Sequence, residues 1–278
     1  MLDLLLAIGC SALISILMRL SDSHIHEKLP MLTVNYVTCA FLSAAFSLEG
    51  GLLPATDGAG TTLMLGALCG MLYLNSFVLL QWNVGRSGVV LPSVFMKLGV
   101  MVPTLLSIAC FGETPTAPQF IGFALAICAI VLINLEKGGS TAGNRLGLIA
   151  LLLAGGMSDA MSKIYERFGT PQLSSQYLLY TFVVALALCL ALTVVKKQRF
   201  GVREALYGVA LGVPNYFSAK FLLRSLSSIP AVVAYPSFSV GTIVLVTLAG
   251  VAFFHEKLSA RQIVGLCVIG TALVLLNL

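Results

Sequence analysis

Long uninterrupted runs of apolar residues dominate the chain, and short stretches containing charge, Gly or Pro separate them. The runs are continuous rather than alternating and far exceed the length of a barrel strand, so they predict transmembrane helices. At roughly 20 residues per crossing, the chain has room for about ten such helices. Their expected spans are 2–20, 31–48, 62–83, 88–111, 118–135, 145–163, 174–195, 203–226, 230–254 and 260–277.

The end of each half of the chain repeats the same sequence. Residues 111–135 match residues 254–278 at a constant offset of 143, and ten of the 25 positions are identical. Weaker matches reach the other helices, so the pattern predicts two five-helix repeats, residues 1–139 and 140–278. Because five is odd, the repeats must enter the membrane from opposite sides and have inverted topology. Inverted repeats predict a substrate site near the midplane and alternating access.

Composition narrows the class of protein. With 58% hydrophobic residues, 10% charged residues and a mean hydropathy of +0.99, a soluble fold is excluded. The net charge of +5 indicates loop orientation rather than nucleic-acid binding. The seven cysteines lie in apolar segments without metal-ligand spacing, and no phosphate-binding loop is present. We therefore expect a multi-pass protein of the cell (inner) membrane that is not an enzyme and needs no metal or cofactor.

Each half combines a polar and aromatic third helix, a Pro-containing fourth helix, a Glu corner and a Gly-containing last helix. The third helices read LYLNSFVLLQWNVGRSGVV and VPNYFSAKFLLRSLSSIPAVV. This pattern resembles the ten-helix EamA-like members of the drug/metabolite transporter superfamily over essentially the whole chain. The resemblance implies ten helices around a central cavity, walled by the first, third, fourth, sixth, eighth and ninth helices. It implies a transporter without naming the cargo, because substrates in that superfamily vary widely.

Two arguments about orientation disagree. The superfamily usually keeps both termini in the cytoplasm. In this chain the loops that would then lie outside, together with their edges, carry eleven Lys and Arg residues, against three on the opposite side. The positive-inside rule therefore predicts that both termini lie outside. Both orientations stay open at this point.

Three charged residues lie well inside the expected spans, away from their ends, namely Lys97, Asp159 and Lys220. An ionisable group at mid-bilayer costs about 2.5–3.5 kcal/mol on an insertion scale, so such groups usually serve a function. Their counterparts in the other repeat are apolar or nearly so, which suits a site for one asymmetric substrate. We expect Lys97 or Lys220 to attract an anionic or zwitterionic group, with Asp159 as counter-ion or proton carrier. The alternative is a structural ion pair, or side chains that reach the membrane surface from nearer the helix ends.

Five uncharged residues are further candidates for substrate binding. Asn75 and Asn215 are counterparts in the two repeats, and they would either face the cavity or hydrogen-bond between helices. Tyr73, Tyr216 and Tyr235 are candidate cavity residues, although tyrosine is also common at membrane interfaces.

Proline and glutamate residues mark expected hinges and helix caps. Pro92 and Pro236 should kink the fourth and ninth helices, and Pro214 should free a carbonyl beside Asn215. Glu113 and Glu256 should each cap the N-terminus of the helix that follows.

Two glycine pairs at a spacing of four, Gly66 with Gly70 and Gly208 with Gly212, are typical of closely packed membrane helices. We therefore expect a secondary transporter, an exporter of a small polar organic metabolite, driven by the solute gradient or by proton exchange. It would act as a monomer or homodimer. Alternatives are a flippase for a lipid-linked headgroup, a non-transporting membrane protein, or a membrane-embedded enzyme, which would need a cluster of His, Asp or Glu.

Overall fold

The computed structural model describes residues 1–22, 24–25, 27–47, 51, 56–87, 90–134, 145–254, 260–276 and 278. These residues form helices with short connections, and no strand occurs among them. The helices are α1 (Leu2–Asp22), α2 (Lys28–Phe46), α3 (Ala59–Ser87), α4 (Val90–Leu98), α5 (Met101–Phe111), α6 (Ala117–Asn134), α7 (Arg145–Phe168), the short 3-10 helix η3 (Pro171–Leu173), α8 (Ser174–Val195), α9 (Val202–Leu226), α10 (Ala231–Phe254) and α11 (Ala260–Leu276).

Six of the described helices are long and apolar enough to cross a membrane. They are α1, α2, α3, α7, α10 and α8, the last taken together with η3. The prediction of an all-α membrane protein is confirmed.

A turn at Gly99 and Val100 divides the expected span 88–111 into α4 and α5. Pro103 accounts for the break, because it has no N–H for the carbonyl four residues earlier and its ring clashes with that carbonyl. A tighter turn replaces the helical bond, with the amide of Val102 donating to the Gly99 carbonyl at 2.9 Å. One continuous helix over this span is therefore a wrong prediction. A kink at Pro92, which lies in the first turn of α4, stays a prediction.

The helices form two compact units that do not coincide with the two halves of the sequence. The first unit consists of residues 1–74 and 164–224, and the second of residues 75–163 and 225–278. Each unit therefore takes helices from both halves of the chain. The proposed repeats, which concern sequence likeness rather than compactness, stay a prediction.

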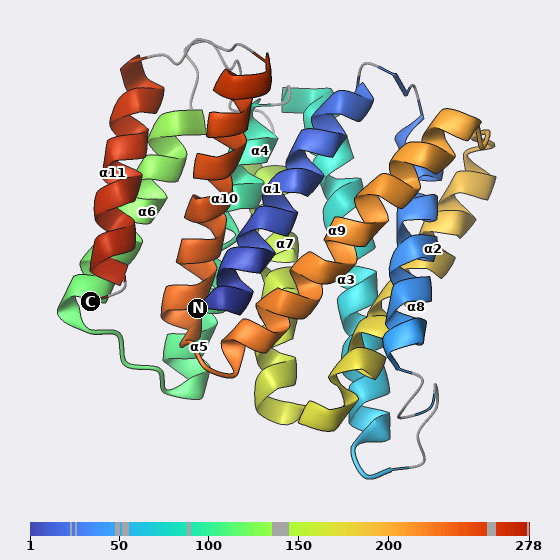
Figure 1. Cartoon of the computed structure of the whole chain (residues 1–278), viewed down its shortest axis with the longest axis horizontal. Helices are drawn as coiled ribbons and strands as arrows, with labels where there is room; N and C mark the ends of the chain where they lie inside the picture. The colour runs from blue at the N-terminus through green and yellow to red at the C-terminus, as the bar shows by residue number, and fades with distance from the viewer. Residues whose placement is uncertain are drawn as a thin grey trace. The chain divides into compact units, whose positions relative to one another are not determined.

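In the first unit, α2 and α8 lie side by side along their length (Figure 1). The hydroxyl oxygens of Thr33 and Thr193 are 3.0 Å apart, and the thiol of Cys189 donates to the carbonyl of Leu29 at 3.7 Å. Residues near the start of α2 thus meet residues near the end of α8, so the two helices are antiparallel.

Glycine pairs bring two further helices of the first unit onto this pair. A Cβ on Gly70 of α3 would stand 2.5 Å from the carbonyl oxygen of Thr181 in α8. A Cβ on Gly212 of α9 would stand 2.8 Å from the carbonyl oxygen of Asn35 in α2. Both distances are shorter than a real Cβ tolerates, so only glycine permits these contacts. The predicted close packing at these two glycine pairs is confirmed.

In the second unit, α6 and α11 pack along each other (Figure 1). A Cβ on Gly122, near the start of α6, would stand 3.0 Å from the carbonyl oxygen of Ala272 and 3.0 Å from the amide of Leu276, near the end of α11. This pair is also antiparallel. The segments of the sequence that match best, at the ends of the two halves, are thus direct neighbours.

Candidate functional site

One face of α7 carries two charged residues of the second unit, Asp159 and Lys163. Gly156, Asp159 and Lys163 follow one another at intervals of three and four residues, so they lie along one face of the helix. A Cβ on Gly99, at the junction of α4 and α5, would stand 3.0 Å from the amide of Gly156. Lys163 contacts Glu113, which follows the other end of α5. Asp159 therefore lies between two contacts that hold α7 to α5.

Asp159 lies deep within α7 and keeps its carboxylate unpaired among the described residues. It stands nine residues before Phe168, where the helix ends, which is roughly 14 Å at the helical rise per residue. Its side chain is exposed. The buried Tyr235 of α10 donates its hydroxyl to the main-chain carbonyl of Asp159 at 2.8 Å. This bond holds that turn of α7 against α10 and does not involve the carboxylate.

Lys97 brings a charge of opposite sign to the same region. It lies in the last turn of α4, two residues before Gly99, and its side chain is partly exposed. No described residue forms an ion pair with it, Asp159 included. Lys97 and Asp159 each lie within about one helical turn of the contact between Gly99 and Gly156. The second unit thus holds a cation and an anion that form no ion pair within the described ranges, both near one helix crossing.

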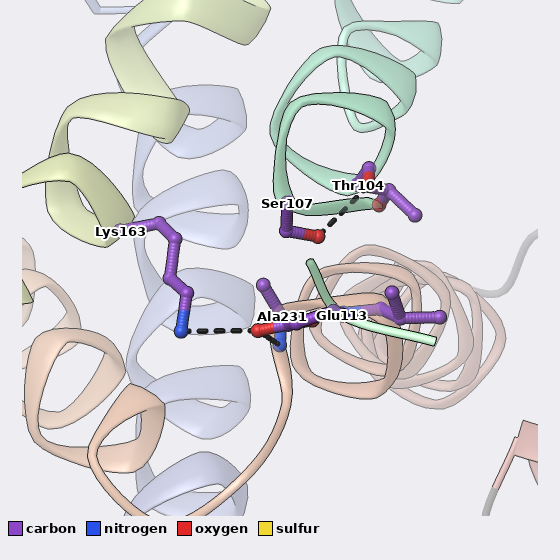
Figure 2. A network of polar contacts seen from close by, with 6 residues as sticks. Thr104, Ser107, Glu113, Lys163 and Ala231 are labelled. Atoms are coloured by element: carbon purple, nitrogen blue, oxygen red, sulfur yellow. Dashed lines mark hydrogen bonds and ion pairs between the residues drawn. The ribbon is translucent and has the colours of Figure 1, made fainter. Parts of the chain in front are cut away.

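Lys163, by contrast, is paired. Its ammonium lies 3.0 Å from Oε1 of Glu113, and the residue is only 7% exposed (Figure 2). The two oxygens of the same carboxylate accept hydrogen bonds from the amides of Ala231 and Val232, each at 3.1 Å. These amides belong to the first turn of α10, where a helix has free N–H groups and favours an anion. One carboxylate therefore joins the α5–α6 connection, α7 and α10.

Hydrogen bonds also fix the position and the ionisation of Glu113. Its amide donates to the carbonyl of Ser107 at 3.1 Å, and the Ser107 hydroxyl donates to the carbonyl of Thr104 at 2.8 Å (Figure 2). Burial raises the pKa of the Glu113 carboxyl, but the two α10 amides and Lys163 lower it more. The net pKa lies below its ordinary value, so Glu113 is a carboxylate at neutral pH.

The sequence predicts that Glu113 caps the helix that follows it, and this prediction is wrong. The following helix, α6, has its own cap: the Thr116 amide donates to Oε1 of Gln119 at 3.1 Å, and the Gln119 amide donates to Oγ1 of Thr116 at 3.4 Å. The Glu113 carboxylate instead caps α10, which begins more than a hundred residues later in the chain. The corresponding prediction for Glu256 lies outside the described residues.

In the first unit, Asn215 forms a bond between helices. Its Nδ2 donates to Oδ1 of the buried Asn35 in α2 at 3.2 Å. The close approach at Gly212, one turn earlier in α9, makes this bond possible. The geometry thus fits the interhelical alternative for Asn215. Its counterpart Asn75 has an exposed side chain and belongs to the second unit, so the structure gives the two asparagines different surroundings.

Lys220 has an aromatic environment. Its ammonium lies 3.6 Å from the ring centroid of Phe46 and 5.6 Å from that of Tyr216, both favourable cation–π positions. The rings of Phe46 and Tyr216 stack with centroids 5.7 Å apart. Tyr73 meets Phe182 edge to face at 6.3 Å. Lys220 also lies only six residues before the end of α9, so the structural reading fits it better than the substrate-binding one.

The remaining candidates are prolines within helices. Pro214 lies inside α9 beside Asn215, and Pro236 lies inside α10 directly after Tyr235. The next residue, Ser237, is 4% exposed, and its hydroxyl has no hydrogen-bond partner among the described residues. Sequence reasoning did not select Ser237, since a serine in an apolar helix usually bonds to its own main chain. No group of three His, Cys, Asp or Glu residues in the described ranges could hold a metal ion.

Three comparisons place this chain among known proteins. The model of the Small Multidrug Resistance protein family matches residues 176–269. A Haemophilus influenzae protein described as uncharacterized is 23% identical over 274 residues, which cover 95% of this chain and 93% of that protein. A crystal structure at 15% sequence identity has a TM-score of 0.76 over 99% of this chain and 94% of that one, and so shows the same fold. The family match and the apolar helices together indicate a multi-pass membrane protein of the transporter type.

Proposed function

We propose that this protein is a secondary transporter that exports a small, polar, zwitterionic metabolite across the cell (inner) membrane. It acts by alternating access and performs no chemical reaction. The observation that carries the proposal is the pair of opposite charges, Lys97 and Asp159, which have no ion-pair partner among the described residues and lie near one helix crossing.

A zwitterion fits this pair on energetic grounds. A charge within a membrane helix is costly unless an opposite charge or hydrogen bonds compensate it. A solute with an ammonium and a carboxylate group would compensate both, with its cation toward Asp159 and its anion toward Lys97. A solute with one charge would leave one of the two side chains uncompensated. Selectivity for zwitterions would therefore follow from the cost of the unmatched charge.

The packing of corresponding helices supports inverted repeats of the EamA-like, drug/metabolite transporter kind. Corresponding helices of the two repeats pack antiparallel, α2 with α8 and α6 with α11. The glycine pair of α3 packs on α8, and the corresponding pair of α9 packs on α2. An approximate twofold relation between inverted repeats would produce this exchange of partners. Inverted repeats in turn supply the two equivalent conformations that alternating access requires.

Counterflow into proteoliposomes tests the proposal. Vesicles with purified protein are preloaded with one member of a panel of zwitterionic amino acids, organic anions, organic cations and neutral sugars, and labelled solute is added outside. We expect exchange of zwitterions above that of protein-free vesicles, and little exchange of cations or neutral sugars. Preference for a cation or a neutral solute would contradict the charge argument, and no exchange of any class would contradict transport.

A pH gradient imposed on the same vesicles tests coupling. If Asp159 carries a proton, uptake of the zwitterion should follow the proton gradient in wild type, while Asp159→Asn should exchange solute without any response to the gradient. Equal responses in both proteins would remove Asp159 from proton coupling.

A further inference from the structure

Two connections of the first unit meet at one end of its helices. The connection between α1 and α2 contains Glu27, and the connection between α8 and α9 contains Arg199. The carboxylate of Glu27 accepts a hydrogen bond from the main-chain amide of Arg199 at 2.7 Å. Because this bond uses the amide, the Arg199 guanidinium is not needed for it and remains exposed.

This end of the unit is strongly cationic. Five basic residues lie in or beside the two connections, and each is exposed: Lys28, Lys196, Lys197, Arg199 and Arg203. We call these residues the basic patch. The acidic side chains described beside them are Glu27 and Glu204, both only partly exposed. The patch thus presents a clear excess of positive charge where apolar helices end.

The backbone of Lys197, one residue of the basic patch, is strained. Its φ angle is 53°, so its backbone is left-handed. Among the described residues, no other residue except glycine has a positive φ angle. Its amide donates to the Val194 carbonyl at 3.0 Å, and the amide of Gln198 donates to the Thr193 carbonyl at 3.1 Å. These bonds form the usual left-handed termination of a helix, in which the left-handed position is usually glycine. The Cβ of a lysine at this position is strained, so the residue lowers stability while it places a charge on the surface.

Apolar side chains accompany these cations. Val194 and Val195, in the last turn of α8, are 65% and 75% exposed, and Phe200 and Val202 are 52% and 77% exposed. Exposed apolar side chains beside lysine and arginine match the boundary of a bilayer, where acyl chains meet headgroups. A site for a free phosphate ion would not need them.

We propose that the basic patch binds the headgroups of anionic phospholipids, and that this binding stabilises the first unit by holding the α1–α2 and α8–α9 connections together. The cations attract the phosphate groups, while Phe200 and the exposed valines enter the boundary of the acyl chains. The attraction is electrostatic, so it weakens as salt is added. This inference does not depend on what the protein transports.

Thermal unfolding in mixed micelles tests the proposal without a transport assay. Purified full-length protein is titrated with phosphatidylglycerol or with phosphatidylcholine, and the melting temperature gives an apparent lipid affinity. We expect phosphatidylglycerol to raise the melting temperature of the wild type well beyond phosphatidylcholine, and high salt to reduce the difference. Removing one patch cation should weaken the apparent affinity about fivefold.

The variant Lys197→Gly separates charge from folding. It removes one cation and the left-handed strain, so its melting temperature in phosphatidylcholine should be higher than that of the wild type. The further rise in melting temperature on adding phosphatidylglycerol should be smaller than in the wild type. The matched control is Arg167→Gln, which removes an exposed cation in the last turn of α7, outside the basic patch. It should keep the full rise in melting temperature that phosphatidylglycerol gives. The proposal is wrong if Lys197→Gly and Arg199→Gln show the same rise in melting temperature with phosphatidylglycerol as the wild type. It is also wrong if Arg167→Gln loses this rise to the same extent, or if inorganic phosphate alone produces the same rise.

Discussion

Asp159 and Lys163 lie one turn apart on the same face of α7, yet their surroundings differ in kind. Lys163 is buried and joined to Glu113, which also caps α10. Asp159 is exposed and has no ion-pair partner among the described residues, although its main chain is bonded to Tyr235. The paired charge of Lys163 joins parts of the scaffold. We propose that the charge of Asp159, at similar depth, contacts the solute.

Removing the partner of Lys163 should give the largest effect. Glu113→Gln leaves a buried ammonium without its carboxylate, and we expect the free energy of unfolding to fall by about 3 kcal/mol. Denaturant titration of the purified protein in detergent measures this loss. The exposed carboxylate of Asp57 supplies the control, since Asp57→Asn should change stability by no more than about 0.5 kcal/mol.

The double variant Glu113→Leu with Lys163→Met sharpens the same experiment. Replacing both charges by apolar groups removes the uncompensated ammonium and should restore most of the stability. The remaining deficit, about 1 kcal/mol, would be the lost cap of α10. If the double variant is as unstable as Glu113→Gln alone, the ion pair is not the source of the loss.

Replacing the unpaired charge should instead affect transport. Asp159→Asn should fold as well as wild type but reduce zwitterion exchange about tenfold or more, because a hydrogen bond to a charged group contributes about 1.5–3 kcal/mol. Exchange is measured in vesicles that contain equal amounts of folded protein. Lys163→Met should show the reverse pattern, with lower stability and near-normal exchange per folded molecule. Equal loss of exchange in both variants would remove the distinction between the two residues.

Acid should produce the smallest effect. The pKa of Glu113 is lowered by folding from its ordinary value of 4.5. A lowered pKa contributes stability that is complete above the pKa of the unfolded chain and is lost as the pH falls through that of the folded one. We therefore expect the melting temperature to decline below about pH 4.5, with a smaller decline in Glu113→Gln. Identical pH profiles would show that Glu113 does not titrate in this way.

The sequence predicts the helices well because each apolar run carries its own signal. It also predicts the close contacts at Gly70 and Gly212, since paired small residues in apolar helices have few other uses. It does not predict the break between α4 and α5, because the apolar run over 88–111 is continuous and does not show that Pro103 interrupts the helix one turn earlier.

Partners distant in the chain could not be predicted in this way. Glu113 is recognisable as a cap, but its target on α10 depends on how α5, α7 and α10 pack. The burial of Lys163 and its ion pair with Glu113 likewise depend on packing that the sequence does not show. Asn215 has a partner in Asn35 that only the packing of α9 on α2 reveals. Local signals thus define helices, whereas the identity of each polar partner depends on packing.

The exchange of partners at the glycine pairs has a consequence for how the protein is made. In the first unit, α2 and α3 find their neighbours in α8 and α9, which the ribosome synthesises roughly a hundred residues or more later. Until then the glycine pair of α3 and the surface of α2 that receives the α9 glycines lack these partners. The first unit can therefore be completed only after residues 164–224 have been synthesised.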